Sequence, residues 1–351
     1  MFHSLPAIDE AAIATAARIL RAGRLVAFPT ETVYGLGANA LEPEAVARIY
    51  AVKGRPPTSP LIVHVASIEM AQSLVATWPN AADRLARKFW PGPLTLVLEK
   101  SHAETGASPI PSGVGSTLLS VTAERTEAIA LVPTAIPPIV TAGLSTVGLR
   151  MPNHPIALAL IRAAGVPLAA PSANRFTQLS PTTADHVRAS LGDDVDYILD
   201  GGPCRVGIES TVLSLAGPDP ILLRPGGISR QHLEAEIGPI LTTAEVPDGA
   251  HPSPGMHARH YSPCTSLLLV SNGEVPEHGN GIYLQHLHLP TRADVAVIEM
   301  PISATDYAAA LYDTLHRADQ TDRDWIAVDI PPNTPEWEAV QDRLRRAVSK
   351  S

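Results

Sequence analysis

The sequence has 351 residues, of which 45% are hydrophobic and 17% are charged, and its formal net charge is −9. This length suggests two globular domains, and the composition excludes a chain that is mainly disordered. The acidic balance argues against a protein whose main task is to hold nucleic acid on a broad basic face, but it is compatible with a small anion pocket.

Two further features narrow the class of protein. Cys204 and Cys264 lie far apart and form no CxxC pair, which argues against a zinc cluster, a redox dithiol or a disulfide framework. The segment MFHSLPAIDEAAIATAARIL lacks the layout of a signal peptide, and no run of about 18 apolar residues occurs. We therefore expect a cytoplasmic protein with no membrane span.

The N-terminal part alternates between amphipathic and short apolar segments. Helices are expected at 8–22, at 43–53 and, once or twice, within 68–88. Strands are expected at 24–29, 60–65 and 93–99. The segment TETVYGLGANA follows the first strand, and its two glycines predict a turn-rich loop.

A second run of elements begins at residue 144. Strands are expected at 144–150, 166–170, 196–199, 208–214 and 220–224, and helices at 155–164 and 183–191. Strands and helices mix without strict βαβ repetition, which favours an α/β fold of the mixed α+β kind. Residues 101–139 separate the two runs and are interpreted as an insertion without chemistry of its own.

The remaining chain has a different pattern. Residues 227–264 contain one short helix, ISRQHLEAEI, and then VPDGAHPSPGMHARHYSP, which is typical of a long linker. Beyond the linker, strands are expected at 265–271, 281–287, 294–300 and 324–330, and helices at 304–319 and at the end of the chain. The sequence thus predicts a large domain at 1–226, a linker at 227–264 and a small α/β domain at 265–351.

Two cations lie close together in AVKGRPPTSPL. Lys53 and Arg55 lie at the end of an expected helix and precede two prolines, which places them in a rigid turn. Cations held in this way could neutralise charge on transferred or leaving phosphates. A solvated helix terminus, with cations that match the helix dipole, is the alternative.

Polar groups also follow several expected strands. Hydroxyls and amides of the loop PSANRFTQLSPTT could hold an anion, although an ordinary turn with a helix cap explains them as well. Thr30, Glu31, Thr32 and Tyr34 follow the first strand.

His64 ends a further strand, and a histidine in a strand is often only structural. Arg150 and Arg224 end two others shortly before a proline. Each arginine could clamp a carboxylate or a phosphate, or form a structural ion pair.

Common nucleotide and nucleophile motifs are missing from the sequence. It has no GxxxxGK[ST], no full GxGxxG, no GxSxG and no HExxH. A nucleotide would therefore have to be bound by dispersed side chains.

The order of several segments is more specific than any one of them. They run FPTETVYGLGANA, KGRP with PLIVHV, FWPGPLTLVL, VTAGLSTVGLRMPNHP, LAAPSAN with LSPT, ILDGGPC with GIESTV, and LLRPGG. This series resembles the threonylcarbamoyl-AMP synthase family with its YrdC-like catalytic domain. SPGMHARHYSP and the extra C-terminal domain resemble the two-domain form of that family.

The resemblance implies a YrdC-like twisted sheet around a deep, positively lined cavity, followed by a small Rossmann-like α/β domain. It implies that L-threonine, bicarbonate and ATP, with Mg²⁺ carried by the nucleotide, give L-threonylcarbamoyladenylate and pyrophosphate. A separate transferase machinery would then modify the adenosine next to the anticodon of tRNA, with weak direct tRNA contact and no role for a membrane.

The resemblance also assigns residues, with Lys53 and Arg55 in catalytic roles at the ATP phosphates and with no metal ligands. The implied ATP-binding positions are Lys53, Arg55, Pro57, Thr141, Ser172, Asn174, Ser180, Arg224 and the linker Tyr261. The implied threonine-binding positions are Thr30, His64, Arg150, Ala170 and Ser210. The linker is expected to act as a lid over the adenylate.

The sequence departs from the family pattern in three places. The insertion at 101–139 ends beside Thr141, Phe176 stands where small residues are more frequent, and Ser145 replaces a frequent aspartate.

Three other functions stay open: an RNA-binding module, a carbamoyl-transferring enzyme and a non-catalytic nucleotide binder. The acidic balance disfavours tight non-specific RNA binding. The chain also lacks the cysteines and the length for the acylphosphatase and zinc-finger modules of the carbamoyl-transferring enzymes. Pyrophosphate release that depends on threonine and bicarbonate would distinguish the synthase from all three.

Overall fold

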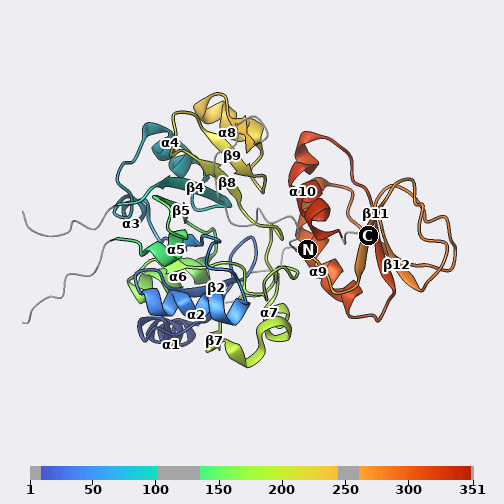
Figure 1. Cartoon of the computed structure of the whole chain (residues 1–351), viewed down its shortest axis with the longest axis horizontal. Coiled ribbons are helices and arrows are strands. Elements are labelled where there is room, and N and C mark those ends of the chain that lie inside the picture. Colours follow the sequence, from blue (N-terminus) through green and yellow to red (C-terminus); the bar gives the residue numbers. More distant parts are fainter. Residues whose placement is uncertain (1–8, 102–134, 244–260, 349–351) are drawn as a thin grey trace, which may run out of the picture.

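The computed structural model describes residues 9–101, 135–243 and 261–348, and these residues form two sheets with surrounding helices (Figure 1). Ten of the described strands make a mixed sheet in the order β10-β9-β8-β4-β5-β3-β6-β2-β1-β7. Four parallel strands make a second sheet in the order β11-β14-β12-β13. The predicted mixed α/β fold is thereby confirmed. Most of the expected insertion and the proline-rich part of the linker lie outside the described residues.

The larger sheet carries helices on both faces. Its strands are β1 Val26–Phe28, β2 Gly35–Asn39, β3 Ile62–His64, β4 Leu94–Glu99, β5 Thr146–Arg150, β6 Leu168–Ala169, β7 Tyr197–Ile198, β8 Thr211–Ser214, β9 Ile221–Arg224 and β10 Leu241–Thr242. The helices are α1 Glu10–Arg21, α2 Pro43–Lys53, α3 Ile68–Gln72, α4 Asn80–Phe89, α5 Pro138–Thr141, α6 Pro155–Ala164, α7 Ala184–Leu191 and α8 Arg230–Ile237.

Strand β1 shows how the layers arise from the sequence. Successive side chains of a strand point to opposite faces. Val26 and Phe28 accordingly join the apolar cluster of α1 and α6, whereas Ala27 joins the cluster that includes α2. Both faces of the strand are therefore buried, which its continuous run of apolar residues predicts.

The prediction of a loop over TETVYGLGANA was wrong for its second half. Residues Gly35–Asn39 form β2, which pairs antiparallel with β1 and β6. A Cβ atom on Gly37 would lie 2.7 Å from the ring of Phe28. The glycine here makes room for an aromatic ring inside the sheet, where the sequence pattern suggested a turn. The short elements α5 and β10 were also not predicted.

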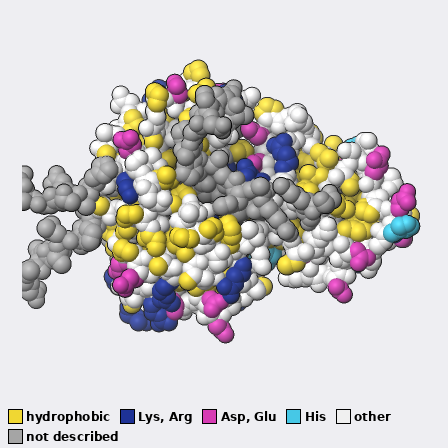
Figure 2. All heavy atoms as spheres, in the orientation of Figure 1, with side chains coloured by type: hydrophobic (Ala, Val, Ile, Leu, Met, Phe, Trp, Pro, Cys, Tyr) yellow, Lys and Arg dark blue, Asp and Glu magenta, His cyan; other side chains and the backbone are white. Residues whose placement is uncertain are grey.

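The smaller sheet consists of β11 Ser266–Val270, β12 Gly281–Gln285, β13 Ala296–Glu299 and β14 Trp325–Asp329. Helices α9 Ala304–Asp319 and α10 Glu338–Ala347 lie between this sheet and the larger part of the molecule (Figure 1). Ile208 and Tyr261 belong to the same apolar cluster as these helices. The two parts are therefore packed together through a shared core. Among the described residues, no helix is long and apolar enough to cross a membrane. On the face shown in Figure 2, hydrophobic side chains are interspersed with polar and charged ones.

Candidate active site

A cavity opens where several strands of the larger sheet end. It encloses about 550 Å³, including the part that is open to solvent. Strand register explains part of its lining, because His64 lies opposite Arg150 in the parallel pair β3–β5 and Ser210 directly precedes β8. The predicted site residues that line the cavity are Thr30, Arg55, His64, Arg150, Ala170, Ser172, Ser210, Arg224 and Tyr261.

Arg55 reaches the cavity from a braced turn. Helix α2 ends at Gly54 with a left-handed backbone (φ 63°), and the Tyr50 hydroxyl donates to the carbonyls of Ser59 (3.0 Å) and Ile139 (2.9 Å). Arg55 Nη2 donates to the carbonyl of Pro60 (3.1 Å), while no partner of Nε is found among the described residues. Burial lowers the pKa of Arg55 to about 10, so the side chain remains charged at neutral pH.

The ring of Phe176, one of the three departures from the family pattern, packs on this arginine. The guanidinium carbon of Arg55 lies 5.8 Å from the ring centre. The aromatic residue therefore helps to fix the cation.

Lys53 holds a neighbouring loop in place. Its ammonium donates to the carbonyl oxygens of Ser172 (2.6 Å) and Asn174. Burial, followed by the nearby Arg55 and Arg175, lowers the pKa of Lys53 well below its usual value. Through these two hydrogen bonds, Lys53 fixes the backbone that presents Ser172 to the cavity.

The residues predicted near threonine are arranged around a turn and a strand end. Thr30 Oγ1 donates to the carbonyl of Val33 (2.6 Å) and accepts from the amides of Thr32 and Val33, which forms a compact turn after β1. His64 is buried, and its ring lies edge-on to Phe28 at 6.0 Å. Burial and the charge of Arg150 lower the pKa of His64 to about 3, so this imidazole is neutral at neutral pH.

Arg150 is paired with a buried carboxylate. Its Nη2 atom lies 2.8 Å from Glu31 Oε2, and the two side chains are 5% and 3% exposed. Arg150 Nε also donates to the carbonyl of Gly92 (3.4 Å). The sequence placed Glu31 next to the candidate groups but gave it no role. The structure shows that it orients Arg150.

Ser210 and Arg224 form another part of the cavity wall. Arg224 donates from Nε to the carbonyl of Ser210 (3.0 Å) and from Nη2 to its hydroxyl (3.1 Å). The Ser210 hydroxyl also lies 2.8 Å from that of Thr95. Gly226 is required beside them, since a Cβ atom there would lie 2.2 Å from the amide nitrogen of Thr211.

Five predicted nucleotide contacts, Lys53 among them, lie around the cavity, and none of the five is among the described side chains that line it. Thr141 Oγ1 accepts from Lys100 Nζ (3.1 Å) and donates to the carbonyl of Leu144 (2.9 Å). The Asn174 amide donates to carbonyls of its own loop, and Ser180 Oγ donates to Glu209 (2.6 Å). Pro57 is exposed in the turn after α2.

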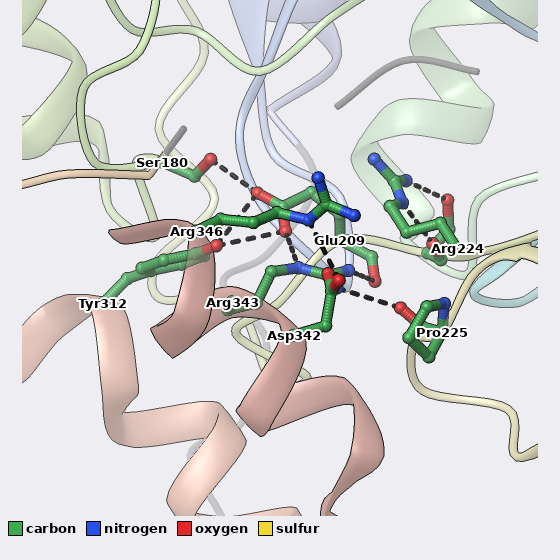
Figure 3. A network of polar contacts seen from close by, with 9 residues as sticks. Ser180, Glu209, Arg224, Pro225, Tyr312, Asp342, Arg343 and Arg346 are labelled. Carbon is green, nitrogen blue, oxygen red and sulfur yellow. Dashed lines mark hydrogen bonds and ion pairs between the residues drawn. The ribbon is translucent and has the colours of Figure 1, made fainter. Parts of the chain in front are cut away.

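Three residues that the sequence did not single out meet at one edge of this cavity (Figure 3). Glu209 lines the cavity, and Arg343 and Tyr312 reach its carboxylate from α10 and α9. Glu209 stands in the GIESTV segment, beside a predicted residue. Arg343 and Tyr312 lie in the C-terminal part of the chain, for which the sequence analysis predicted no chemistry.

The chemistry of the lining suits an anion. Three buried guanidinium groups, those of Arg55, Arg150 and Arg224, accompany hydroxyls and a neutral imidazole. The carboxylates of Glu31 and Glu209 are each paired with an arginine. In the described part of the chain, no cluster of three or more His, Cys, Asp or Glu residues could hold a metal ion.

Known proteins resemble the chain along nearly its whole length. A family model described as telomere recombination (Sua5, YciO and YrdC) matches residues 18–118 and 116–226, and one described as threonylcarbamoyl-AMP synthase, C-terminal domain, matches 228–349. The chain is 40% identical to the threonylcarbamoyl-AMP synthase of Bacillus subtilis, over 97% of this chain and 93% of that protein. It is 44% identical to the one from Pyrococcus abyssi, over 75% of this chain and 69% of that protein.

A solved structure is similar as well. The crystal structure of P. abyssi Sua5 complexed with L-threonine has a TM-score of 0.80 and 37% identity, and the match covers 97% of this chain and 95% of that one.

Proposed function

Because the chain belongs to the threonylcarbamoyl-AMP synthase family, we propose that it converts L-threonine, bicarbonate and ATP to L-threonylcarbamoyladenylate and pyrophosphate. One observation carries the proposal: the guanidinium groups of Arg55, Arg150 and Arg224 meet in one cavity with hydroxyls of two strand-end loops. This arrangement can hold phosphates and a carboxylate at the same time without a glycine-rich phosphate loop.

The reaction needs no covalent enzyme intermediate. The threonine nitrogen attacks the carbon of bicarbonate, which gives a carbamate and water. A carbamate oxygen then attacks the α-phosphorus of ATP, and the bond to the bridging oxygen breaks as pyrophosphate leaves. The protein contributes by positioning the reactants and neutralising their charge.

We assign the nucleotide end of the cavity to Arg55 and Arg224, with Ser172 held in place by Lys53. Thr141, Asn174, Ser180 and Pro57 frame the loops around it. Tyr261, which is 1% exposed beside this end, covers the nucleotide. Mg²⁺ would arrive with the ATP phosphates, because Glu209 in the cavity lining and Glu31 next to it are already paired with arginine.

We assign the threonine end to Arg150, which binds the carboxylate while Glu31 holds it. Thr30, His64, Ser210 and the backbone of Ala170 surround the rest of the amino acid. A polar contact to the threonine hydroxyl would reject valine more strongly than serine, because a missing methyl group is worth only about 1–3 kcal/mol.

The proposed division of labour follows the chain. Residues 1–226 form the catalytic domain, with the insertion at about 101–139. Residues 227–264 link this domain to the C-terminal domain at 265–351 and act as a lid. The adenylate would pass to a separate threonylcarbamoyl transferase that acts on tRNA.

Pyrophosphate release tests the proposal. In the wild type, it should require threonine, bicarbonate and ATP together, and Lys53→Ala and Arg55→Ala should each abolish most of it. Arg87→Ala is the matched control, since that side chain is 71% exposed and pairs with Asp83 on its own helix. Release that persists when threonine or bicarbonate is omitted would refute the proposed reaction.

A further inference from the structure

A buried arginine of the C-terminal domain contacts the wall of the cavity from outside (Figure 3). Arg343, on α10, is 1% exposed. Its Nε atom lies 2.7 Å from Glu209 Oε2, and its Nη2 donates to the carbonyl of Glu209 (3.2 Å). Its Nη1 donates to the carbonyl of Pro225 (3.0 Å) and pairs with Asp342 (2.7 Å). One guanidinium thus binds two separate segments of the catalytic domain.

Both segments continue directly into the cavity. Glu209 precedes Ser210, and Pro225 follows Arg224. Inside the cavity, Arg224 donates to the carbonyl and the hydroxyl of Ser210. Arg343 therefore joins from outside the same two segments that Arg224 joins from inside, so moving Arg343 would move the residues proposed to bind substrate.

Glu209 receives donors from both domains. Its Oε1 accepts from Ser180 Oγ (2.6 Å), and the Tyr312 hydroxyl lies 3.1 Å from Oε2. Burial alone would raise the pKa of Glu209, but the charges of Arg343 and Arg224, together with the hydrogen bonds from Ser180 and Arg343, outweigh burial and hold this pKa below its usual value. The carboxylate is therefore charged, and its position depends on how α9 and α10 are docked.

The linker meets the same guanidinium. The guanidinium carbon of Arg343 lies 5.5 Å from the ring centre of Tyr261. The ring centres of Tyr261 and Tyr312 are 5.9 Å apart. Helix α9 also packs closely against the segment that leads to Glu209, since a Cβ atom on Gly207 would lie 2.5 Å from the carbonyl oxygen of Ala308 on α9.

We propose that Arg343 is a positioning residue for the reaction, which acts through Glu209 to hold Ser210 and Arg224 in the cavity wall. The C-terminal domain then completes the active site. This inference rests on the proposed function, because Ser210 and Arg224 matter only if the cavity binds the substrates.

The test uses the full chain and kinetic constants for pyrophosphate release, measured where circular dichroism shows each variant to be folded. Arg343→Met should lower kcat/KM for ATP by about a hundredfold, as expected when groups around a reacting centre are displaced. Arg343→Lys should recover part of this loss, because an ammonium can pair with Glu209 but cannot also fork to the two carbonyls. Arg345→Met, an exposed arginine of the same helix, should stay within about twofold of wild type.

A double substitution separates positioning from simple docking. If Arg343 acts through Glu209, the effects of Arg343→Met and Glu209→Gln should not multiply, and the double variant should be no slower than the slower single variant. Wild-type kcat and KM in folded Arg343→Met would overturn the inference, as would effects that multiply. If Arg343→Met does not fold, Arg343→Lys and Tyr312→Phe decide, and unchanged kinetics in both would overturn it.

Calorimetric titration with ATP, without threonine, keeps the two proposals apart. If the wild type binds ATP but releases no pyrophosphate, the proposed reaction fails. The ATP affinity of the Arg343 variants then tests the positioning role, and an unchanged affinity overturns it. If the wild type does neither, both proposals fall.

Discussion

Two buried ion pairs border the cavity, and their lengths are nearly equal: Arg150–Glu31 at 2.8 Å and Arg343–Glu209 at 2.7 Å. Both partners of the first pair belong to the catalytic domain. The second pair joins the catalytic domain to α10. The first therefore depends on the order of the strands, whereas the second depends on how two domains dock.

The two carboxylates also differ in their other partners. Among the described residues, no hydrogen-bond partner is found for either carboxylate oxygen of Glu31. The carboxylate of Glu209 accepts hydrogen bonds from Ser180 and Tyr312 in addition to its ion pair with Arg343. Because an unpaired buried charge is costly, loss of the arginine should be felt far more at Glu31 than at Glu209.

The largest expected effect is on stability after Arg150→Met. This substitution leaves Glu31 buried without its cation and should lower the free energy of unfolding by about 3–5 kcal/mol. Arg343→Met should lower it less, because two neutral donors remain on Glu209. Urea unfolding of both variants measures this difference directly.

A second substitution distinguishes stability from function at the first pair. Arg150→Met with Glu31→Gln should regain most of the lost stability, because the stranded charge is gone. It should not regain pyrophosphate release, because the proposed clamp for the threonine carboxylate is still missing. Recovery of activity in the double variant would show that Arg150 does not bind threonine.

A smaller loss of stability is expected from a substitution at Gly207, where the two domains lie close together. Gly207→Ala and Gly165→Ala both place a side chain on a left-handed backbone (φ 75° and 72°), at a cost of about 1–2 kcal/mol each. At Gly165, the new Cβ meets no described atom within 4 Å, whereas at Gly207 it meets α9 at 2.5 Å. The clash should add about 1–3 kcal/mol.

The same pair of variants tests whether domain docking affects activity. Gly207→Ala should slow pyrophosphate release, because the segment that leads to Glu209 must move away from α9. Gly165→Ala should not slow it, because Gly165 directly follows α6 and is not among the residues that line the cavity. Equal kinetics in the two variants would show that activity tolerates a shift of this segment.

The sequence analysis singled out Arg150 of the first ion pair but neither partner of the second, for a physical reason. Arg150 and Arg224 end apolar strands shortly before proline, and such strand ends gather at one edge of a sheet. The glycines of β2 misled the prediction, because their role is to accommodate Phe28 rather than to turn the chain.

Arg343 leaves a weaker trace in the sequence. It follows Val340 by three residues and precedes Ala347 by four, and both of these are buried. This spacing places an arginine on the apolar face of a helix, where it requires an acidic partner. The partner lies 134 residues away in the sequence, and local patterns do not identify it.

The smallest expected effect concerns two stacked histidines between the domains. The rings of His186 and His316 are 3.9 Å apart, and His316 Nε2 lies 3.1 Å from the carbonyl of Ser180. Burial, followed by the charge of His186, lowers the pKa of His316 to about 4, although the Ser180 carbonyl, Asp319 and Asp313 oppose this shift. The folded protein therefore keeps His316 neutral in mildly acidic solution.

The sign of the pH dependence follows from this difference. Between about pH 6.5 and pH 4, the unfolded chain binds a proton at His316 that the folded chain does not. The free energy of unfolding should thus decrease as the pH is lowered across this window, by about 1.4 kcal/mol per pH unit at most from this residue. His316→Gln should flatten the slope measured by urea unfolding, and the exposed His278→Gln serves as a control for removing a histidine. His64 and His154, whose pKa values are also lowered by burial, should leave a residual slope of the same sign. If the slope is unchanged in His316→Gln, the contact between the domains does not respond to mild acid, and the slope comes from the catalytic domain instead.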